Sequence, residues 1–367
     1  MCIRDSIRTN RDINELFREN DSIGVDYTTL EFTTFLEDEI KWTDKFTTNI
    51  GARLSAYHVE DRVVSFFEPR LIGQYALNRK NLINGTYTRN SQYLHLLTTG
   101  ISLPIDVWVP SVNDLRPQVA QQFTLGFFRG QGNSLHFSVE GFYKKMKNVI
   151  ENRGQFFDEE TASFMLSDST FTIGQGRSYG LEFSGHKKFN KGFTFFNYTL
   201  SKAERLFDDI NLGKWFPFLY DRTHSIRTGF NWQLTDKMNV SSSWSFHSGT
   251  PKAIINQLLQ FDQESIAQFN PPNNFNSNRT PYYHRLDIAA QFVFPGKYST
   301  THFLKIGAFN IYNRHNDIFY FLVSQEDNDG VVRDELSPAS LISFFPQLTY
   351  TAKFDFSKKN KKEDRGN

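Results

Sequence analysis

Residues 177–202 read RSYGLEFSGHKKFNKGFTFFNYTLSK, and apolar side chains alternate with polar ones on both sides of a break at FNKG. In the first half, Tyr179 and Leu181 fall on one face of an extended chain, whereas Gly180 and Glu182 fall on the other. Successive side chains of a β-strand point to opposite faces, so this alternation predicts two strands whose faces meet different surroundings. The fold then depends on what covers the apolar face.

The composition narrows the classes of protein to consider. The 367 residues carry a formal net charge of +1, so no overall field attracts nucleic acid, and we expect no nucleic-acid partner. Phe occurs 38 times and aromatics make up 16% of the chain, which is more than a water-soluble core normally needs. The single cysteine, Cys2, excludes an internal disulfide framework. No segment reaches the roughly 18 consecutive apolar residues of a transmembrane helix.

Two-residue alternation recurs along the whole chain and predicts thirteen strands. They are about 13 residues long, whereas strands of globular proteins centre on about 5 or 6. The predicted strands cover 28–41, 46–58, 66–78, 82–95, 118–130, 134–148, 176–188, 192–205, 222–235, 238–250, 283–295, 301–313 and 343–356.

Short and long connections alternate between these strands. Tight turns are predicted at 42–45, 78–81, 130–133, 189–192 and 235–237, with a slightly longer one at 295–300. The intervening connections are long and polar at 96–117, 149–175, 206–221, 251–282 and 314–342, and only 59–65 is short. Nearly all long loops therefore lie at one end of the sheet, as they do in transmembrane β-barrels.

The two faces of the predicted strands differ strongly in polarity. In the strand at 28–41, Leu30, Phe32 and Leu36 oppose Glu31 and Glu37, and other strands repeat this contrast. A half-buried soluble sheet would need a second layer over its apolar face, and the sequence predicts no helices that could supply one. We therefore predict an all-β, antiparallel, up-and-down transmembrane barrel with lipid outside and a wet lumen; a soluble β-fold is the alternative.

Nine motifs occur in an order that resembles one family. The chain is similar to the C-terminal part of the β-barrel of TonB-dependent outer-membrane receptors, especially those of Bacteroidetes-type bacteria, over roughly residues 25–356. The motifs are EPRLIGQYALN (68–78), LRPQVAQQFTLGF (115–127), FSVEGFYKKMKNVIENR (137–153), GRSYGLEFSGHKKFNKGFTFFNYTLSKAE (176–204), FPFLYDRTHSIRTG (216–229), SWSFHSGTP (243–251), YYHRLDIAAQFVF (282–294), GAFNIYNRHN (307–316) and FPQLTYTAKFDF (345–356).

The resemblance implies a barrel of roughly 22 strands closed by an N-terminal plug, in the outer membrane of a Gram-negative bacterium. Such receptors import a scarce ligand, such as a siderophore, cobalamin or a glycan, with energy relayed by TonB. We interpret this chain as a fragment without the plug and the TonB-contacting region: residues 1–24 outside the barrel, 25–357 as barrel, and 358–367 as a charged tail. Phe356 resembles the terminal aromatic of the family, although SKKNKKEDRGN follows it.

Candidate site residues fall into two groups. Aromatics near the long loops offer flat surfaces with hydrogen-bonding tips for a small-molecule or oligosaccharide ligand. The alternative is that they anchor loops or form the outer aromatic belt. These ligand candidates are Trp108, Trp215, Phe216, Tyr220, Tyr282 and His284. Charged residues on the polar face are predicted to form a lumen network, namely Glu140, Glu182, Arg227, Arg285 and Asp287.

The sequence contains no recognisable motif for catalysis or cofactor binding. It has no GxSxG, HExxH or P-loop pattern, and its nine histidines show no metal-ligand spacing, so we expect neither an enzyme nor a cofactor nor a metal site. Two membrane functions remain open: an energy-coupled importer, or a passive porin-like or adhesin-type barrel. A plug domain encoded upstream would separate them.

Overall fold

The computed structural model describes residues 2–7, 27–59, 61–97, 107–112, 115–131, 135–152, 157–158, 163–164, 171–252, 254–255, 275–297, 300–326, 332–340 and 343–355. Phe356 and the predicted tail at 358–367 lie outside the described residues, as does most of the segment at 1–24. Within the described part of the chain, no helix is long and apolar enough to cross a membrane.

Thirteen long strands correspond one for one to the strands predicted from the alternation. They are β2 (Tyr27–Lys41), β3 (Phe46–Val59), β4 (Arg62–Asn78), β5 (Asn81–Gln92), β8 (Gln118–Gln131), β9 (Leu135–Asn152), β12 (Phe171–Phe189), β13 (Gly192–Leu206), β15 (His224–Thr235), β16 (Met238–His247), β18 (Tyr283–Pro295), β19 (Thr300–Phe309) and β22 (Phe345–Phe354). The all-β prediction is confirmed.

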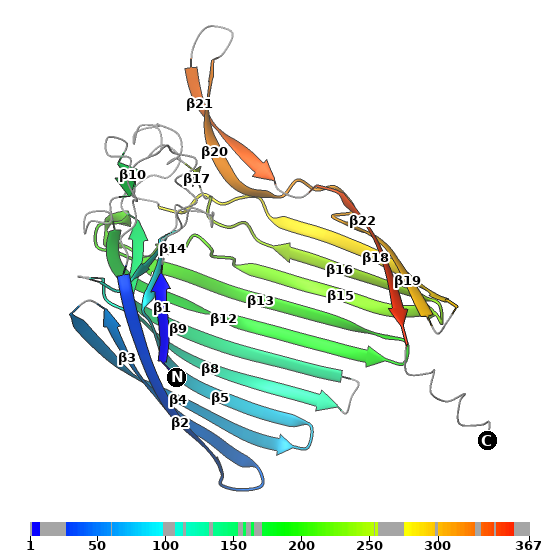
Figure 1. Ribbon diagram of the computed structural model, residues 1–367, viewed down its shortest axis with the longest axis horizontal. Helices are drawn as coiled ribbons and strands as arrows, with labels where there is room; N and C mark the ends of the chain where they lie inside the picture. Colours follow the sequence, from blue (N-terminus) through cyan, green and yellow to red (C-terminus); the bar gives the residue numbers. More distant parts are fainter. Residues whose placement is uncertain are drawn as a thin grey trace, which may run out of the picture.

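These strands form one curved antiparallel sheet in chain order (Figure 1). Each long strand pairs with the next one along the chain, so the connectivity is up and down without crossovers. Counting the short β1 (Cys2–Ile7) and β14 (Phe216–Pro217), the sheet has 15 strands. β1 pairs antiparallel with β2, with Cys2 opposite Phe32. Part of the segment expected outside the barrel therefore joins the sheet, and the proposed division at residue 24 stays a prediction for the remainder.

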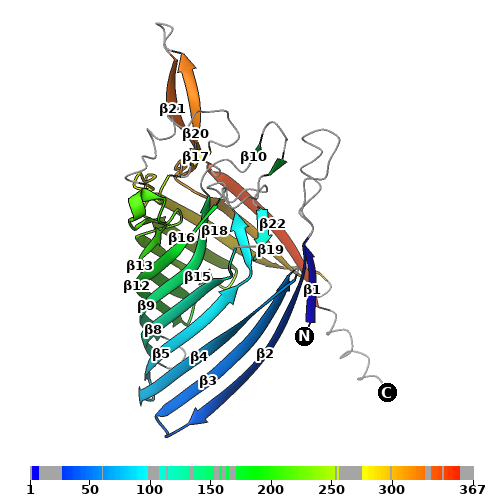
Figure 2. The same cartoon turned by 90° about the vertical axis from the view of Figure 1, so that its left-hand side faces the viewer.

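The two ends of the sheet differ as the connection lengths predict. Tight turns join β2 to β3, β12 to β13 and β15 to β16 at one end. At the other end lie the elements of the long connections, among which β20 and β21 rise beyond the main sheet (Figure 2). These elements are β6 (Leu94–Leu97), β7 (Val107–Pro110), β10 (Phe157–Asp158), β11 (Ser163–Phe164), β17 (Ile254–Ile255), β20 (Asp317–Glu326), β21 (Val332–Ser340) and the 3₁₀ turn η2 (Asn211–Gly213). We refer to this end as the loop end.

The strand register keeps the apolar face continuous across the sheet. Leu181 of β12 lies opposite Leu200 of β13 and Gly141 of β9, and Gly141 lies opposite Leu125 of β8. Side chains of this face stay uncovered, as the 66% exposure of Leu125 shows. Loop-end segments instead pack against the polar face. We call the apolar face the outer face and the polar face the inner face.

The apolar band on the outer face has the height of a hydrocarbon core. On β12, Tyr179 lies ten residues before Phe189, and both side chains belong to the outer face. At about 3.3 Å per residue and a tilt of about 40°, these residues stand roughly 25 Å apart along the barrel axis. That is the height of the lipid-facing band of outer-membrane barrels, and aromatic residues flank the band at both ends.

Two glycines of β12 allow a test of the register. A Cβ added at Gly180 would collide with the backbone oxygen of Leu200 and would meet the Cα of Ser201 at 2.9 Å, whereas at Gly185 the nearest atom is the His136 oxygen at 3.8 Å. We expect Gly180→Ala to destabilise the folded barrel by about 1–3 kcal/mol and Gly185→Ala to change its stability little. Urea titration of the full-length protein in micelles measures both; equal effects would contradict the pairing of β12 with β13 in this register.

Candidate functional site

The inner face carries an ion pair in the β3–β4 region. Glu68 is 4% exposed, and its carboxylate accepts hydrogen bonds from Arg53 Nε, from the Ser91 hydroxyl and, at 2.5 Å, from the Ser91 backbone N–H. Ser55 and Tyr93 share a further hydrogen bond of 2.6 Å between their hydroxyls. Every partner comes from β3, β4, β5 or the segment that follows β5. The network therefore stiffens the wall under the loops.

The predicted lumen residues all lie on the inner face but do not form one connected network. Arg285 and Asp287 of β18 pair with each other, with 2.9 Å between Nη2 and Oδ2, and Asp287 also accepts the backbone N–H of Asn310 at 3.0 Å. Glu140 and Glu182 lie directly opposite each other on β9 and β12. Arg227 faces Asn197 and Ser245 on the neighbouring strands.

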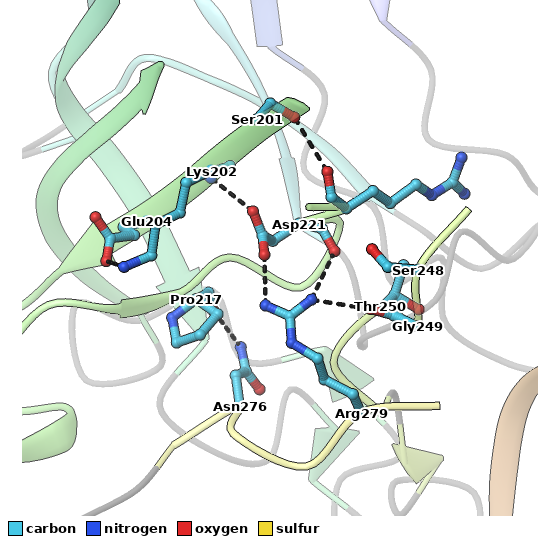
Figure 3. A network of polar contacts seen from close by, with 12 residues as sticks. Ser201, Lys202, Glu204, Pro217, Asp221, Ser248, Gly249, Thr250, Asn276 and Arg279 are labelled. Atoms are coloured by element: carbon cyan, nitrogen blue, oxygen red, sulfur yellow. Dashed lines mark hydrogen bonds and ion pairs between the residues drawn. The ribbon is translucent and has the colours of Figure 1, made fainter. Parts of the chain in front are cut away.

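A buried aspartate joins two connections at the loop end (Figure 3). Asp221 is 1% exposed; its Oδ1 accepts the Ala203 backbone N–H at 2.6 Å and its Oδ2 accepts Arg279 Nη2 at 2.5 Å. Arg279 Nη1 also donates to the Gly249 oxygen at 2.9 Å. Asp221 belongs to the β13–β15 connection, and Arg279 and Gly249 belong to the β16–β18 connection. We call this arrangement the loop latch.

Phe216 belongs to a small hydrophobic core at the loop end. Its side chain is 1% exposed and packs with Val149 and Phe207, and its ring meets the edge of Phe275 at 5.0 Å between centroids. The structure therefore places Phe216 in a packed cluster, and the ligand contact at this residue stays a prediction. The pairing of Phe216 with Arg205 turns the aromatic ring toward the inner face, where the connection folds over it.

Tyr282 and His284 lie at the outer face. In β18, His284 has the same parity as Ile288, and Tyr282 stacks on His284 with 5.8 Å between ring centroids. The Tyr312 hydroxyl lies 2.7 Å from His284 Nδ1, which adds a third ring to the row. Their side chains point away from the lumen, and their ligand role stays a prediction. They belong to the aromatic belt at the loop end of the apolar band.

Trp215 also belongs to the outer face. Arg177, an outer-face residue of β12, places its guanidinium carbon 4.2 Å from the Trp215 ring centroid. Arg177 Nε also donates to Glu204 Oε2 at 2.7 Å. Trp215 therefore continues the aromatic belt beside this ion pair, and its ligand contact stays a prediction.

Two further ligand candidates are exposed at the loop end. Trp108 lies in the β6–β7 hairpin with 48% of its surface exposed, and Tyr220 is 47% exposed, with its ring edge-on to Phe218. Arg205 stands over Phe218 with 4.1 Å between guanidinium carbon and ring centroid. Arg205 and Lys144 are inner-face residues that lie close enough to repel each other, and Glu151 lies near Arg205. The inner face thus presents aromatic and cationic groups below the loops.

A cavity of about 780 Å³ adjoins the loop latch. Its lining comes from the β8–β9–β12–β13 wall, including Gly141 and Gly180, and from Asp221 and Arg279 of the latch. Within the described residues, no three His, Cys, Asp or Glu side chains gather in a group that could hold a metal ion.

Residues 4–313 match the family model of the TonB dependent receptor-like β-barrel, which covers most of the chain. This chain belongs to that family. It is therefore part of a β-barrel of the Gram-negative outer membrane, and its family is one of receptors and not of enzymes. No curated protein gave a significant match.

Solved structures of outer-membrane iron receptors share this fold at low identity. The ferric-catecholate import receptor Fiu of Escherichia coli K12 superposes with a TM-score of 0.60 at 15% identity, over 89% of this chain and 45% of Fiu. The FrpB iron transporter of Neisseria meningitidis gives 0.59 at 10% identity, over 90% and 46% of the two chains. The ferripyoverdine receptor of Pseudomonas aeruginosa gives 0.59 at 13% identity, over 91% and 40%. The chain thus spans less than half the length of these receptors.

Sequence reasoning missed the loop latch and the Arg177–Glu204 ion pair. The two partners of the latch are 58 residues apart in the sequence, and only the return of both connections to the same strand end brings them together. Arg177 and Glu204 could have been found, because pairing β12 with β13 through the tight turn at 190–191 places them directly opposite each other.

The loop latch predicts a local stability effect. We expect Asp221→Ala to cost about 3 kcal/mol, because it leaves the Ala203 N–H and the Arg279 guanidinium without their acceptor. Limited proteolysis of the full-length receptor should then cut the connections at 207–223 and 248–282 faster. The exposed Asp208 in the same connection is the matched control, and Asp208→Ala should leave the cleavage rate unchanged. Equal rates for both variants would contradict the latch.

His95 predicts a pH dependence at the loop end. Its side chain is fully buried, with Nε2 2.9 Å from Ser111 Oγ and Nδ1 3.0 Å from Gln118 Nε2, and burial lowers the pKa of His95 from 6.5 to about 4. The unfolded segment takes up a proton below pH 6.5 and the folded one only near pH 4. The contribution of neutral His95 to the free energy of unfolding is therefore fully present above pH 6.5. It falls by about 3 kcal/mol as the pH drops to 4.

Hydrogen exchange of residues 93–111 between pH 7 and pH 4.5, corrected for the intrinsic pH dependence, measures this effect. We expect protection to fall in the native protein and to depend less on pH in His95→Gln. An NMR titration that places the pKa of His95 near 6.5 would contradict the neutral, buried state of the imidazole.

Proposed function

We propose that this chain is the C-terminal barrel portion of an energy-coupled importer that takes up a scarce ligand of the siderophore, cobalamin or glycan class. The observation that carries the proposal is the inner face at the loop end, where Arg205, Lys144, Phe218 and Tyr220 offer cationic and aromatic surface. Cations and ring faces suit an anionic, aromatic-rich chelate. Among the three ligand classes we therefore favour ferric chelates, which are also the cargo named for the structural relatives.

The remaining parts of the transporter belong to the same proposal. The chain covers less than half of the receptors it resembles, so the plug, the TonB-contacting region and the further strands that close the barrel would be supplied by the rest of the protein. We infer that the plug contacts Glu140, Glu182 and Arg227, since these inner-face side chains are left without an ion pair in the described part of the chain. Membership of the Bacteroidetes-type branch rests on the order of the nine motifs.

Uptake of radiolabelled ferric chelates by cells that express the full-length receptor tests this function. We expect uptake that disappears when TonB is deleted or the inner membrane is de-energised. A passive porin-like or adhesin-type barrel would show no such dependence, and that result would contradict the importer.

A matched pair of variants tests the proposed binding surface. We expect Arg205→Gln to raise the KM for uptake about tenfold, because it removes a charge-assisted contact with the anionic chelate. Lys214→Gln removes an exposed charge of the β13–β15 connection and should leave KM unchanged. Equal KM values for Arg205→Gln and the native receptor would place the ligand elsewhere.

A further inference from the structure

A row of cations lies on the outer face just beyond the apolar band. Lys145 of β9 and Arg177 of β12 are directly opposite each other, and Glu204 of β13 is opposite Arg177. Lys202 of β13 lies two residues away, opposite Tyr179, and its ammonium group reaches Glu204. Directly below Lys145 and Arg177, Tyr143 and Tyr179 stack with 6.4 Å between ring centroids. The tyrosines mark the loop end of the roughly 25 Å apolar band, so the cations stand at the depth of lipid headgroups.

One buried acid orients two of these cations without neutralising the row. Glu204 is 5% exposed; its Oε2 binds Arg177 Nε at 2.7 Å and its Oε1 binds Lys202 Nζ at 2.7 Å. The Trp215 ring holds the Arg177 guanidinium from the other side, at 4.2 Å. Glu204 thus pairs with two of the three cations and holds the side chains of Arg177 and Lys202 in place.

The pairing of Lys145 with Arg177 is unfavourable in the bare protein. Like charges at directly opposed positions of neighbouring strands destabilise a sheet. Within the described part of the chain, the ion pairs do not include Lys145, which is exposed. An anion between the two side chains would turn this repulsion into two favourable contacts.

We propose that Lys145, Arg177 and Lys202 form a binding site for the phosphorylated headgroup of a glycolipid in the outer leaflet. We infer a lipid ligand because the cations lie on the outer face, directly above its apolar surface. This surface includes Leu125, Gly141, Leu181 and Leu200. Leu125, Gly141, Leu181 and Leu200 all line the cavity of about 780 Å³, in which an acyl chain can lie. The three cations would bind the phosphate of the headgroup, and the cavity would hold an acyl chain of the same lipid. This inference depends on the outer-membrane location and not on ligand import.

Binding of a bisphosphorylated glycolipid to the full-length receptor in mild detergent tests the proposal. Native mass spectrometry or calorimetry should show a specific complex that weakens about fivefold in Lys145→Gln, which removes one cation that Glu204 does not hold. Lys202→Gln should give a similar loss. The dephosphorylated glycolipid should bind the native receptor about as weakly as the variants bind the phosphorylated one, and added salt should weaken only the phosphorylated lipid.

Lys187 provides the matched control. It lies on the outer face of the same strand, ten residues from Arg177, at the tight-turn end where its ammonium group stands 5.3 Å from the Phe189 ring. Lys187→Gln should leave glycolipid affinity unchanged. Equal losses for Lys187→Gln and Lys145→Gln would show general charge attraction and overturn the site, as would an unchanged affinity in Lys145→Gln. A heat-modifiability assay confirms that every variant forms the folded barrel before its affinity is compared.

Discussion

Backbone hydrogen bonding is the constraint on which the rest of this structure depends. No water is present in the hydrocarbon core to satisfy a free N–H or C=O, so every spanning strand needs a neighbour on each side. In this chain each long strand finds its neighbour in the next one along the sequence, through tight turns at one end of the sheet. The register that follows decides the face to which every side chain belongs.

The same register separates two kinds of chemistry. The outer face carries leucine, phenylalanine and tyrosine with belts of aromatic residues, and the inner face carries ion pairs such as Arg53–Glu68 and Arg285–Asp287. Stability therefore comes from strand pairing and inner-face polar contacts more than from a packed apolar core. The small apolar clusters around Tyr57 and Phe216 serve a different purpose: they fasten the loop-end segments to the wall.

The sequence predicted the thirteen strands, their order and their faces, because a period of two residues over about 13 residues leaves little ambiguity. The side of the sheet on which each loop-end aromatic lies was harder to predict. His284 and Ile288 share a parity within one predicted strand, so the outward direction of His284 was available from the sequence. Trp215 was different, because the face on which it lies depends on the pairing of β13 with β14. The two-residue β14 is too short to show an alternating pattern in the sequence.

The loop latch could not be predicted for a related reason. Alternation describes residues inside strands, whereas Asp221 and Arg279 lie in irregular connections whose path depends on tertiary packing. The cations on the outer face could be predicted from the sequence once the strand pairing is known. They lie within strands, and correct pairing of β9, β12 and β13 is enough to bring Lys145, Arg177 and Lys202 together.

Spin-label accessibility in a lipid bilayer tests the central claim most directly. Single cysteines are placed at Leu181 and Phe230 on the outer face and at Glu182 and Asn231 on the inner face of the full-length protein, with Cys2 replaced by serine. The account predicts that labels at 181 and 230 collide with oxygen dissolved in the hydrocarbon, and that labels at 182 and 231 avoid this environment. Labels at 181 and 230 that instead report water, with 182 and 231 in lipid, would contradict the assignment of the two faces.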